Sequence, residues 1–204
     1  MAEWFSDLNT LWLLGVAAGV LSTIAYLPYL ADTATGRTQP QRASWLIWSI
    51  LGTIAFFSQL YEGATASLWF AAVQVSGTVT VFLLSIWKGK GVYLRNIDYL
   101  VLAGAGLGLV LWYFTETAAY ALAITISISL MGGALTVSKS YARPESETLV
   151  TWVVSLIASI CALFAVGKVD PVLLAYPAYL FTLYTLFVRA ILLGRRRNAK
   201  LAAA

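Results

Sequence analysis

The chain has 204 residues, of which 60% are hydrophobic and 11% are charged, with a formal net charge of +4 and a mean hydropathy of +0.81. A soluble domain usually carries about 25% charged residues, so a soluble form of this chain would expose large apolar patches. The sequence has no histidine and a single cysteine, Cys161, which excludes imidazole metal ligands, histidine-based triads and an internal disulfide. The composition therefore predicts an integral membrane protein.

Seven apolar stretches are candidates for membrane-spanning helices, each of which needs roughly 20 apolar residues. In chain order they are Leu11–Ala31, Ser44–Tyr61, Thr65–Trp87, Tyr99–Phe114, Ala118–Val137, Leu149–Val166 and Pro171–Leu192. The fourth is short and rich in glycine. The first residues include Glu3 and Asp7 instead of a basic region, so we expect no cleavable signal peptide. We predict an all-α fold of seven transmembrane helices in the plasma (inner) membrane of a bacterium.

The basic residues predict the orientation, because Lys and Arg are retained on the cytoplasmic side. Of the 13 basic residues, 11 follow the first, third, fifth and seventh stretches, Arg189 lies in the last turn of the seventh, and only Lys168 lies on the other side. The N-terminus is therefore expected outside and the C-terminus in the cytoplasm. We interpret the Arg195-Arg196-Arg197 run as a stop-transfer signal and headgroup anchor, with specific anionic-lipid binding as the alternative. So short a run predicts no nucleic-acid partner.

An internal repeat relates the first three stretches to the last three. A shift of 104 residues lays positions 28–81 over 132–185 without a gap, and it pairs Pro40 with Pro144, Trp48 with Trp152, Gly63 with Gly167, Ala71 with Ala175 and Thr78 with Thr182. The alternative is chance, since any two hydrophobic hairpins place tryptophan at interfaces and glycine at turns. The predicted domains are a three-helix repeat at 9–90, a linker helix at 91–117, a second three-helix repeat at 118–194 and a basic cytoplasmic tail at 195–204. The linker lets both repeats keep one orientation, in a 3+1+3 arrangement.

Leu27-Pro28 lies near the cytoplasmic end of the first stretch, and a basic loop then leads to Trp48 and to the turn Leu60-Tyr61-Glu62-Gly63. With its repetition after one linker helix, this pattern resembles the SWEET / PQ-loop transporter superfamily. The resemblance implies the SWEET-like fold, an external N-terminus and solute transport. In the bacterial half-SWEET members an amide side chain thirteen residues after the turn tyrosine faces the substrate, and the matching residue is Gln74. The segment 36–45 is also similar to a loop, G-[KR]-T-x-P-x-R-x-x-W, of uncharacterised bacterial membrane proteins.

The sequence also departs from the superfamily. Tyr29, not glutamine, follows Pro28, and Gly132-Gly133 stands where the second repeat should have its proline. The second and sixth stretches have no proline, and Gln74 corresponds to Ala178. These departures motivate an alternative, a non-transporting membrane module (an accessory or assembly subunit, or a receptor) that reuses the PQ-loop fold.

The polar groups expected at mid-membrane are neutral, while all nine acidic residues lie near helix ends or in loops, so an ion-coupled pump is poorly supported. Gln74 either hydrogen-bonds across helices or lines a wet cavity, because a helix backbone cannot satisfy an amide. Aromatic rings at the same depth can stack a sugar face or a planar solute. We predict solute contacts at Gln74, Trp48, Trp152, Tyr176 and Phe70.

Two prolines are the expected hinges: Pro28, which the resemblance implies, and Pro177, which interrupts the last stretch. No catalytic constellation, metal-ligand spacing or cofactor motif is present, so we expect no enzyme, no metal and no cofactor. The predicted function is facilitated transport of a small neutral solute such as a sugar, by alternating access between the two three-helix repeats. The expected partners are that solute, the lipid bilayer and either a second copy of the chain or a membrane partner subunit.

Overall fold

The computed structural model describes residues 8–61, 66–88, 92–114, 118–167, 169 and 171–203. Within this part it contains seven α-helices, which confirms the predicted all-α fold of seven helices. They are α1 (Leu8–Thr35), α2 (Arg42–Tyr61), α3 (Ala66–Trp87), α4 (Asn96–Tyr113), α5 (Ala118–Ala142), α6 (Leu149–Ala165) and α7 (Pro171–Ala202), with a 3-10 helix, η1 (Pro144–Ser146), before α6. α5 and α7 continue past the expected ends at Val137 and Leu192.

Two of the described helices contain stretches that are long and apolar enough to cross a membrane. These are Thr10–Thr35 in α1 and Leu174–Ala202 in α7. Three shorter apolar stretches lie in α3, α4 and α6, at Ala72–Trp87, Asn96–Leu111 and Leu149–Ala165. The prediction that all seven helices span the bilayer therefore stays a prediction.

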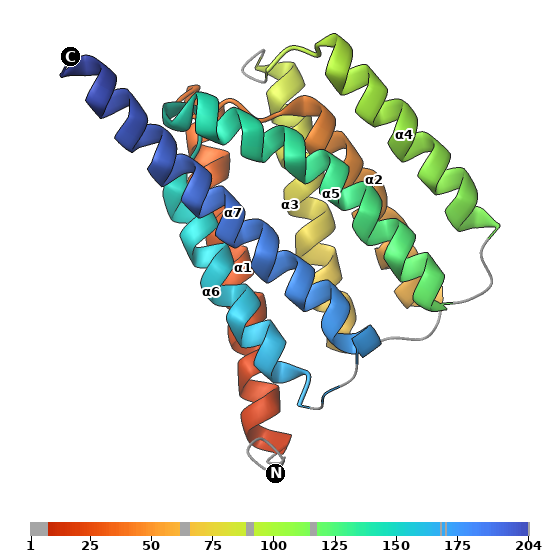
Figure 1. Cartoon of the computed structure of the whole chain (residues 1–204). Helices are drawn as coiled ribbons and strands as arrows, with labels where there is room; N and C mark the ends of the chain where they lie inside the picture. Colours follow the sequence, from red (N-terminus) through yellow and green to blue (C-terminus); the bar gives the residue numbers. More distant parts are fainter. Residues whose placement is uncertain are drawn as a thin grey trace.

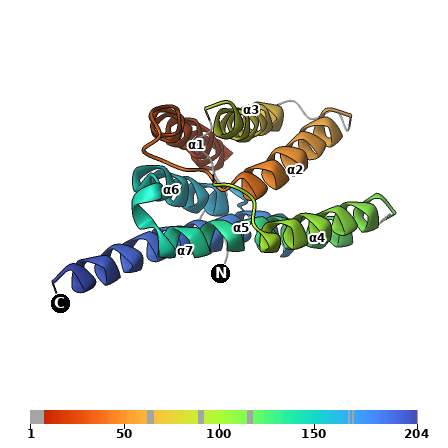
Figure 2. The ribbon, with the colours of Figure 1, turned by 90° about the horizontal axis from the view of Figure 1, so that it is seen from above.

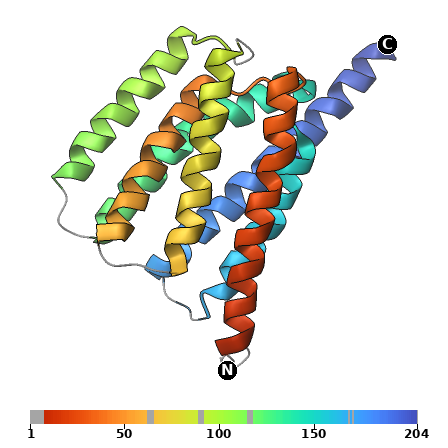
Figure 3. The ribbon, with the colours of Figure 1, turned by 180° about the vertical axis from the view of Figure 1, so that it is seen from behind.

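Two sets of three consecutive helices each pack around their third member. α3 contacts α1 and α2, and α7 contacts α5 and α6. We call α1–α3 the first unit and α5–α7 the second unit. The units meet through the pairs α1–α6 and α2–α5, while α4 lies at the edge of the bundle against α5 and α2 (Figures 1 and 2). Seen from behind, α1, α3, α2 and α4 follow one another across the bundle (Figure 3).

The connections that follow α1, α3 and α5 lie at the same end of the bundle as the C-terminus, and the N-terminus lies at the opposite end (Figure 1). We call this the C-terminal end. It carries the basic residues of these connections and of the last turns of α7: Arg37, Arg42, Lys88, Arg95, Lys139, Arg143, Arg195, Arg196, Arg197 and Lys200. The positive charge that predicts a cytoplasmic face is thus gathered at one end of the molecule.

Gly194 lets α7 cross closely over the end of α5. A Cβ atom on Gly194 would lie 2.5 Å from the backbone oxygen of Tyr141 and 3.1 Å from Cγ of Pro144. The Arg197 guanidinium holds the same crossing, because it lies 4.7 Å from the centre of the Tyr141 ring and donates to the Ala142 carbonyl at 3.0 Å. A backbone oxygen cannot turn away as a side chain can, so this crossing has no room for a methyl group.

We therefore expect Gly194→Ala to destabilise the protein by about 1–3 kcal/mol, as overpacking usually does. The matched control is Gly106→Ala in α4, where an added Cβ has no heavy atom within 4 Å. That change should be neutral or stabilising by up to about 1 kcal/mol, because alanine is the better helix former. Thermal unfolding of the two purified variants in detergent measures the difference, and equal melting temperatures would contradict the close crossing.

Candidate functional site

The loop between α1 and α2 is held at the C-terminal end by its backbone. Gly36 follows α1 with φ of 81°, a left-handed conformation that glycine adopts without Cβ strain. Further along, the Gln39 N–H donates to the Ser146 carbonyl at 3.0 Å, and the Pro40 carbonyl accepts from the Val92 N–H at 2.9 Å. The segment 36–45 that the sequence singled out is therefore where the first unit meets both the second unit and the chain leading to α4.

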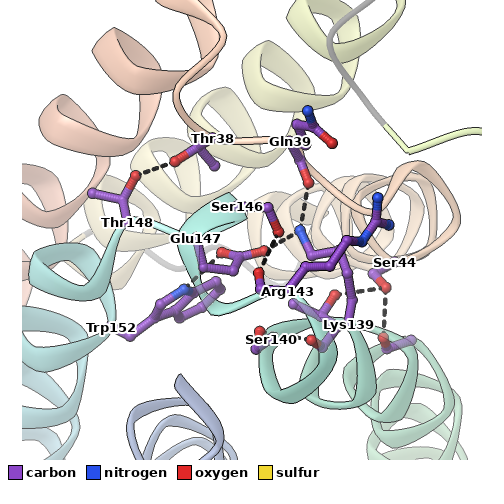
Figure 4. Close-up of polar contacts among 12 residues, drawn as sticks. Thr38, Gln39, Ser44, Lys139, Ser140, Arg143, Ser146, Glu147, Thr148 and Trp152 are labelled. Carbon is purple, nitrogen blue, oxygen red and sulfur yellow. Dashed lines mark hydrogen bonds and ion pairs between the residues drawn. The ribbon is translucent and has the colours of Figure 1, made fainter. Parts of the chain in front are cut away.

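A buried ion pair between Lys139 and Glu147 lies directly beneath this loop (Figure 4). Their side chains are 3% and 0% exposed. The Lys139 ammonium also donates to the Gln39 backbone carbonyl, and the second oxygen of Glu147 accepts from the Trp152 indole N–H at 2.9 Å. Each charge therefore has its opposite charge and a further hydrogen bond, the combination that a buried ion pair requires.

The position of Lys139 has a direct electrostatic consequence. It lies beyond Val137, the last residue of the fifth predicted span, and therefore outside that span. Burial lowers the pKa of Lys139 below its ordinary value, and the Glu147 carboxylate raises it again in part. The charged state of the lysine thus depends on its acidic partner.

Two hydrogen bonds connect the units at matching places. In the α2–α5 contact, Thr136 Oγ1 donates to Ser44 Oγ at 2.8 Å. In the α1–α6 contact, Thr148 Oγ1 donates to Asp32 Oδ2 at 2.9 Å. A shift of 104 residues carries Asp32 onto Thr136 and Ser44 onto Thr148. Neither pair is among the five identities that suggested this shift, so the two contacts are independent of them.

An aromatic cluster fills the interior between the units next to the ion pair. The Trp152 ring centre lies 4.1 Å from that of Phe187 and 5.8 Å from that of Tyr29. Trp45 lies against Tyr29, with ring centres 4.9 Å apart, and against Trp48 at 5.2 Å. The cluster draws rings from α1, α2, α6 and α7, and therefore from both units.

The structure brings two of the predicted solute contacts, Trp48 and Trp152, into this one cluster. Trp152 is 3% exposed, and its ring packs on Phe187. Trp48 is half-buried, packs edge-on against Phe187 at 6.2 Å and donates its indole N–H to the Ser129 carbonyl at 3.4 Å. Both indole donors thus already have acceptors within the protein.

Gln74 of α3 and Tyr176 of α7 are both next to tyrosines on one face of α7. The Gln74 side chain of α3 lies beside the Tyr184 hydroxyl, and the Tyr184 ring lies 6.1 Å from Trp152. Tyr176 packs against Tyr179 at 5.8 Å, and Tyr179 lies next to Trp48. Four of the five predicted contact residues are therefore linked through the aromatic face of α7.

The remaining predicted residues are placed less fully. The side chain of Phe70 lies outside the described part of the structure. Pro28 lies inside α1 and Pro177 inside α7, so both are within helices as a hinge requires. Their role as hinges stays a prediction.

Sequence reasoning missed the burial of Lys139 and Glu147. It assigned both to the loop after the fifth stretch, where charges are usually solvated. The one available signal was a pair of opposite charges eight positions apart in a connection that also holds the repeated proline, Pro144.

Among the described residues, no group of three or more histidine, cysteine, aspartate or glutamate side chains could hold a metal ion. In comparisons with known proteins, no family model, curated protein or solved structure matches the chain.

Proposed function

We propose that the protein is a SWEET-like membrane facilitator for a small neutral solute, working by alternating access between its two three-helix units. In this proposal all seven helices span the bilayer, with the C-terminal end in the cytoplasm. The outward-facing surfaces of α1 and α4 support a lipid environment. Trp12, Leu27, Leu100 and Leu107 are each more than 60% exposed, and apolar surface of this kind is normally covered by lipid or a partner.

The observation that carries the proposal is the equivalence of the two units. Exchanging α1 with α5, α2 with α6 and α3 with α7 turns every contact within the first unit into one within the second. It also turns the α1–α6 contact into the α2–α5 contact. The hydrogen bonds Thr148–Asp32 and Thr136–Ser44 obey the same exchange of helices, because a shift of 104 residues carries Asp32 onto Thr136 and Ser44 onto Thr148. Two equivalent bodies joined by an interface of this kind are what rocking transport between parallel repeats requires.

The chemistry between the units supports a neutral solute. Gln74 and three tyrosines, Tyr26, Tyr179 and Tyr184, lie near one another between α1, α3 and α7. Tyr176, whose ring is 38% exposed, packs beside Tyr179. An amide and phenol hydroxyls offer both donors and acceptors without a net charge. Such groups, together with aromatic faces, suit hydroxyl-rich molecules such as sugars better than ions.

Uptake of a panel of radiolabelled sugars and other neutral solutes into proteoliposomes tests the proposal. We expect uptake above that of empty liposomes, and we expect Gln74→Ala to reduce it about fivefold, the factor for one hydrogen bond worth about 1 kcal/mol. Thr80→Ala on the same helix is the matched control, because Thr80 is exposed and bonds to the Ser76 carbonyl of its own helix. Absence of uptake for every solute would refute transport, and equal effects of the two variants would refute the role of Gln74.

One observation favours the alternative, a non-transporting module that reuses this fold. The indole donors of Trp48 and Trp152 are already bonded to the Ser129 carbonyl and to Glu147, as in a permanently packed interface. In that case the protein extracted from its native membrane should co-purify with a stoichiometric partner subunit. A lone monomer or homodimer would count against the module.

A further inference from the structure

Several of the hydrogen bonds between the two units lie at the C-terminal end of their interface. Lys139 reaches from α5 to the Gln39 carbonyl, and the Gln39 N–H reaches back to the Ser146 carbonyl. Next to them the Thr38 hydroxyl contacts the Thr148 hydroxyl. Figure 4 shows these groups converging from the first-unit loop and from the α5–α6 connection. Separation of the units at this end has to break all of these contacts.

The two charges of the ion pair belong to the same unit. Lys139 lies in the last turns of α5, and Glu147 lies between η1 and α6. The pair can therefore stay intact when the units move apart, and the bond that breaks is the one from the ammonium to the neutral Gln39 carbonyl. Because no charge has to lose its counter-ion, the contact can open and close repeatedly at low cost.

The closed arrangement also leaves some buried polar atoms unsatisfied. Thr33 Oγ1 in α1 and Thr151 Oγ1 in α6 are buried and have no hydrogen-bond partner within the described structure. A buried donor without a hydrogen-bond partner destabilises the structure, and water that enters can bond to it and remove this penalty.

We propose that Lys139 and the Gln39 carbonyl form a latch that closes the cytoplasmic end of the interface between the two units. Glu147 is a positioning residue that keeps Lys139 charged and aimed at the carbonyl. The structure then represents the state that is closed to the cytoplasm, and release of the latch is the step that opens the interface on that side. This inference rests on the proposed function for its direction across the membrane, although the latch itself is a property of the closed structure.

The test measures access to a buried position next to the latch. Ala43 is 0% exposed and directly precedes Ser44, which packs against the second unit. In an Ala43→Cys, Cys161→Ala background, a maleimide added from the cytoplasmic side should label the introduced thiol slowly. Adding Lys139→Met removes the donor and should raise the labelling rate about tenfold or more, because the open population increases. The matched control Arg143→Met, one turn later and exposed, should leave the rate unchanged.

Two further variants make the test specific. Gln39→Ala should leave the labelling rate unchanged, because the latch uses the backbone carbonyl and not the side chain. A Thr38→Cys, Thr148→Cys pair should form a disulfide across the latch, since the two hydroxyls touch. The oxidised pair should then slow labelling at position 43 relative to the reduced pair, measured on the peptide that contains position 43 because maleimide also modifies the two reduced thiols. This comparison applies even where Lys139→Met does not fold.

The outcomes separate the latch from the proposed function. Faster labelling in Lys139→Met without uptake of any solute would support the latch and refute transport. Uptake by the wild type with equal labelling of Lys139→Met, Arg143→Met and the parent would overturn the latch and leave transport standing. Equal labelling of the oxidised and reduced cysteine pair would also overturn it.

Discussion

Glu147→Gln should lower the free energy of unfolding by about 3–5 kcal/mol, because it leaves the Lys139 charge buried without its counter-ion. The expectation depends on the burial of both side chains, which are 3% and 0% exposed. The matched control is Glu145→Gln in the same turn, where the carboxylate is exposed and the expected change lies within about 0.5 kcal/mol. Unfolding in detergent at neutral pH, followed by circular dichroism, measures both variants.

The loss of unfolding free energy caused by Glu147→Gln should become smaller as the pH rises. Burial already lowers the pKa of Lys139, and loss of the Glu147 carboxylate removes the main influence that raises it. Between this lowered pKa and the ordinary value of the unfolded lysine, the unfolded chain binds more protons than the folded one, so stability increases with pH. A deficit that stayed constant from neutral pH to about pH 10 would contradict a buried, titrating lysine.

The double variant Lys139→Met, Glu147→Leu should recover most of the stability that either single change loses. Apolar side chains of similar volume often replace a buried ion pair at no cost in stability. If the latch operates as proposed, the double variant in the Ala43→Cys background will still label rapidly, because the donor to the Gln39 carbonyl is gone. This variant should therefore combine nearly normal stability with rapid labelling. If the ion pair were purely structural, recovered stability would come with slow labelling.

Trp152→Ala should destabilise the protein by about 3–5 kcal/mol, the range for removing a large buried aromatic side chain. Its ring is 3% exposed and packs against Phe187, Tyr184 and Tyr29, and the change also takes the indole donor from Glu147. The control is Trp87→Ala at the end of α3, where the ring is 79% exposed and the expected loss is within about 0.5 kcal/mol. Melting temperatures of the two variants in detergent should differ clearly.

Trp152→Phe distinguishes packing from solute binding at the same position. The phenyl ring keeps most of the apolar contact but removes the donor to Glu147, so we expect about 1–3 kcal/mol of destabilisation. A variant that keeps its stability but loses uptake would identify Trp152 as a solute contact. If stability and uptake fell together, Trp152 would be assigned to the packed interface.

The helices could be predicted from the sequence because apolar length is a strong local signal. The predicted ends failed where charges were taken as boundaries. α5 continues through Lys139, and α7 continues through Arg195–Arg197, and two of these basic side chains, Lys139 and Arg197, have partners within the protein. Arg197 bonds to the Ala142 carbonyl, and Lys139 to Glu147. A charge ends an apolar stretch, but it does not end a helix.

The candidate site was predictable only in part. The repeat pointed to Trp48 and Trp152, and the structure places both in one aromatic cluster. The contact of Lys139 with Gln39 had no comparable signal, since the partners are 100 positions apart and the acceptor is a backbone carbonyl. Every residue has such a carbonyl, so no side-chain pattern records which one is used.

The continuity of α7 joins its basic tail rigidly to the core. Ile191 is fully buried in the core, and the helix runs without a break from there to Ala202. Gly194 and Arg197 hold this part of the helix against the end of α5. A tilt of α7 inside the bundle therefore moves the end of α5 with it, and a single fluorophore near Ala202 would report a motion whose origin lies within the core.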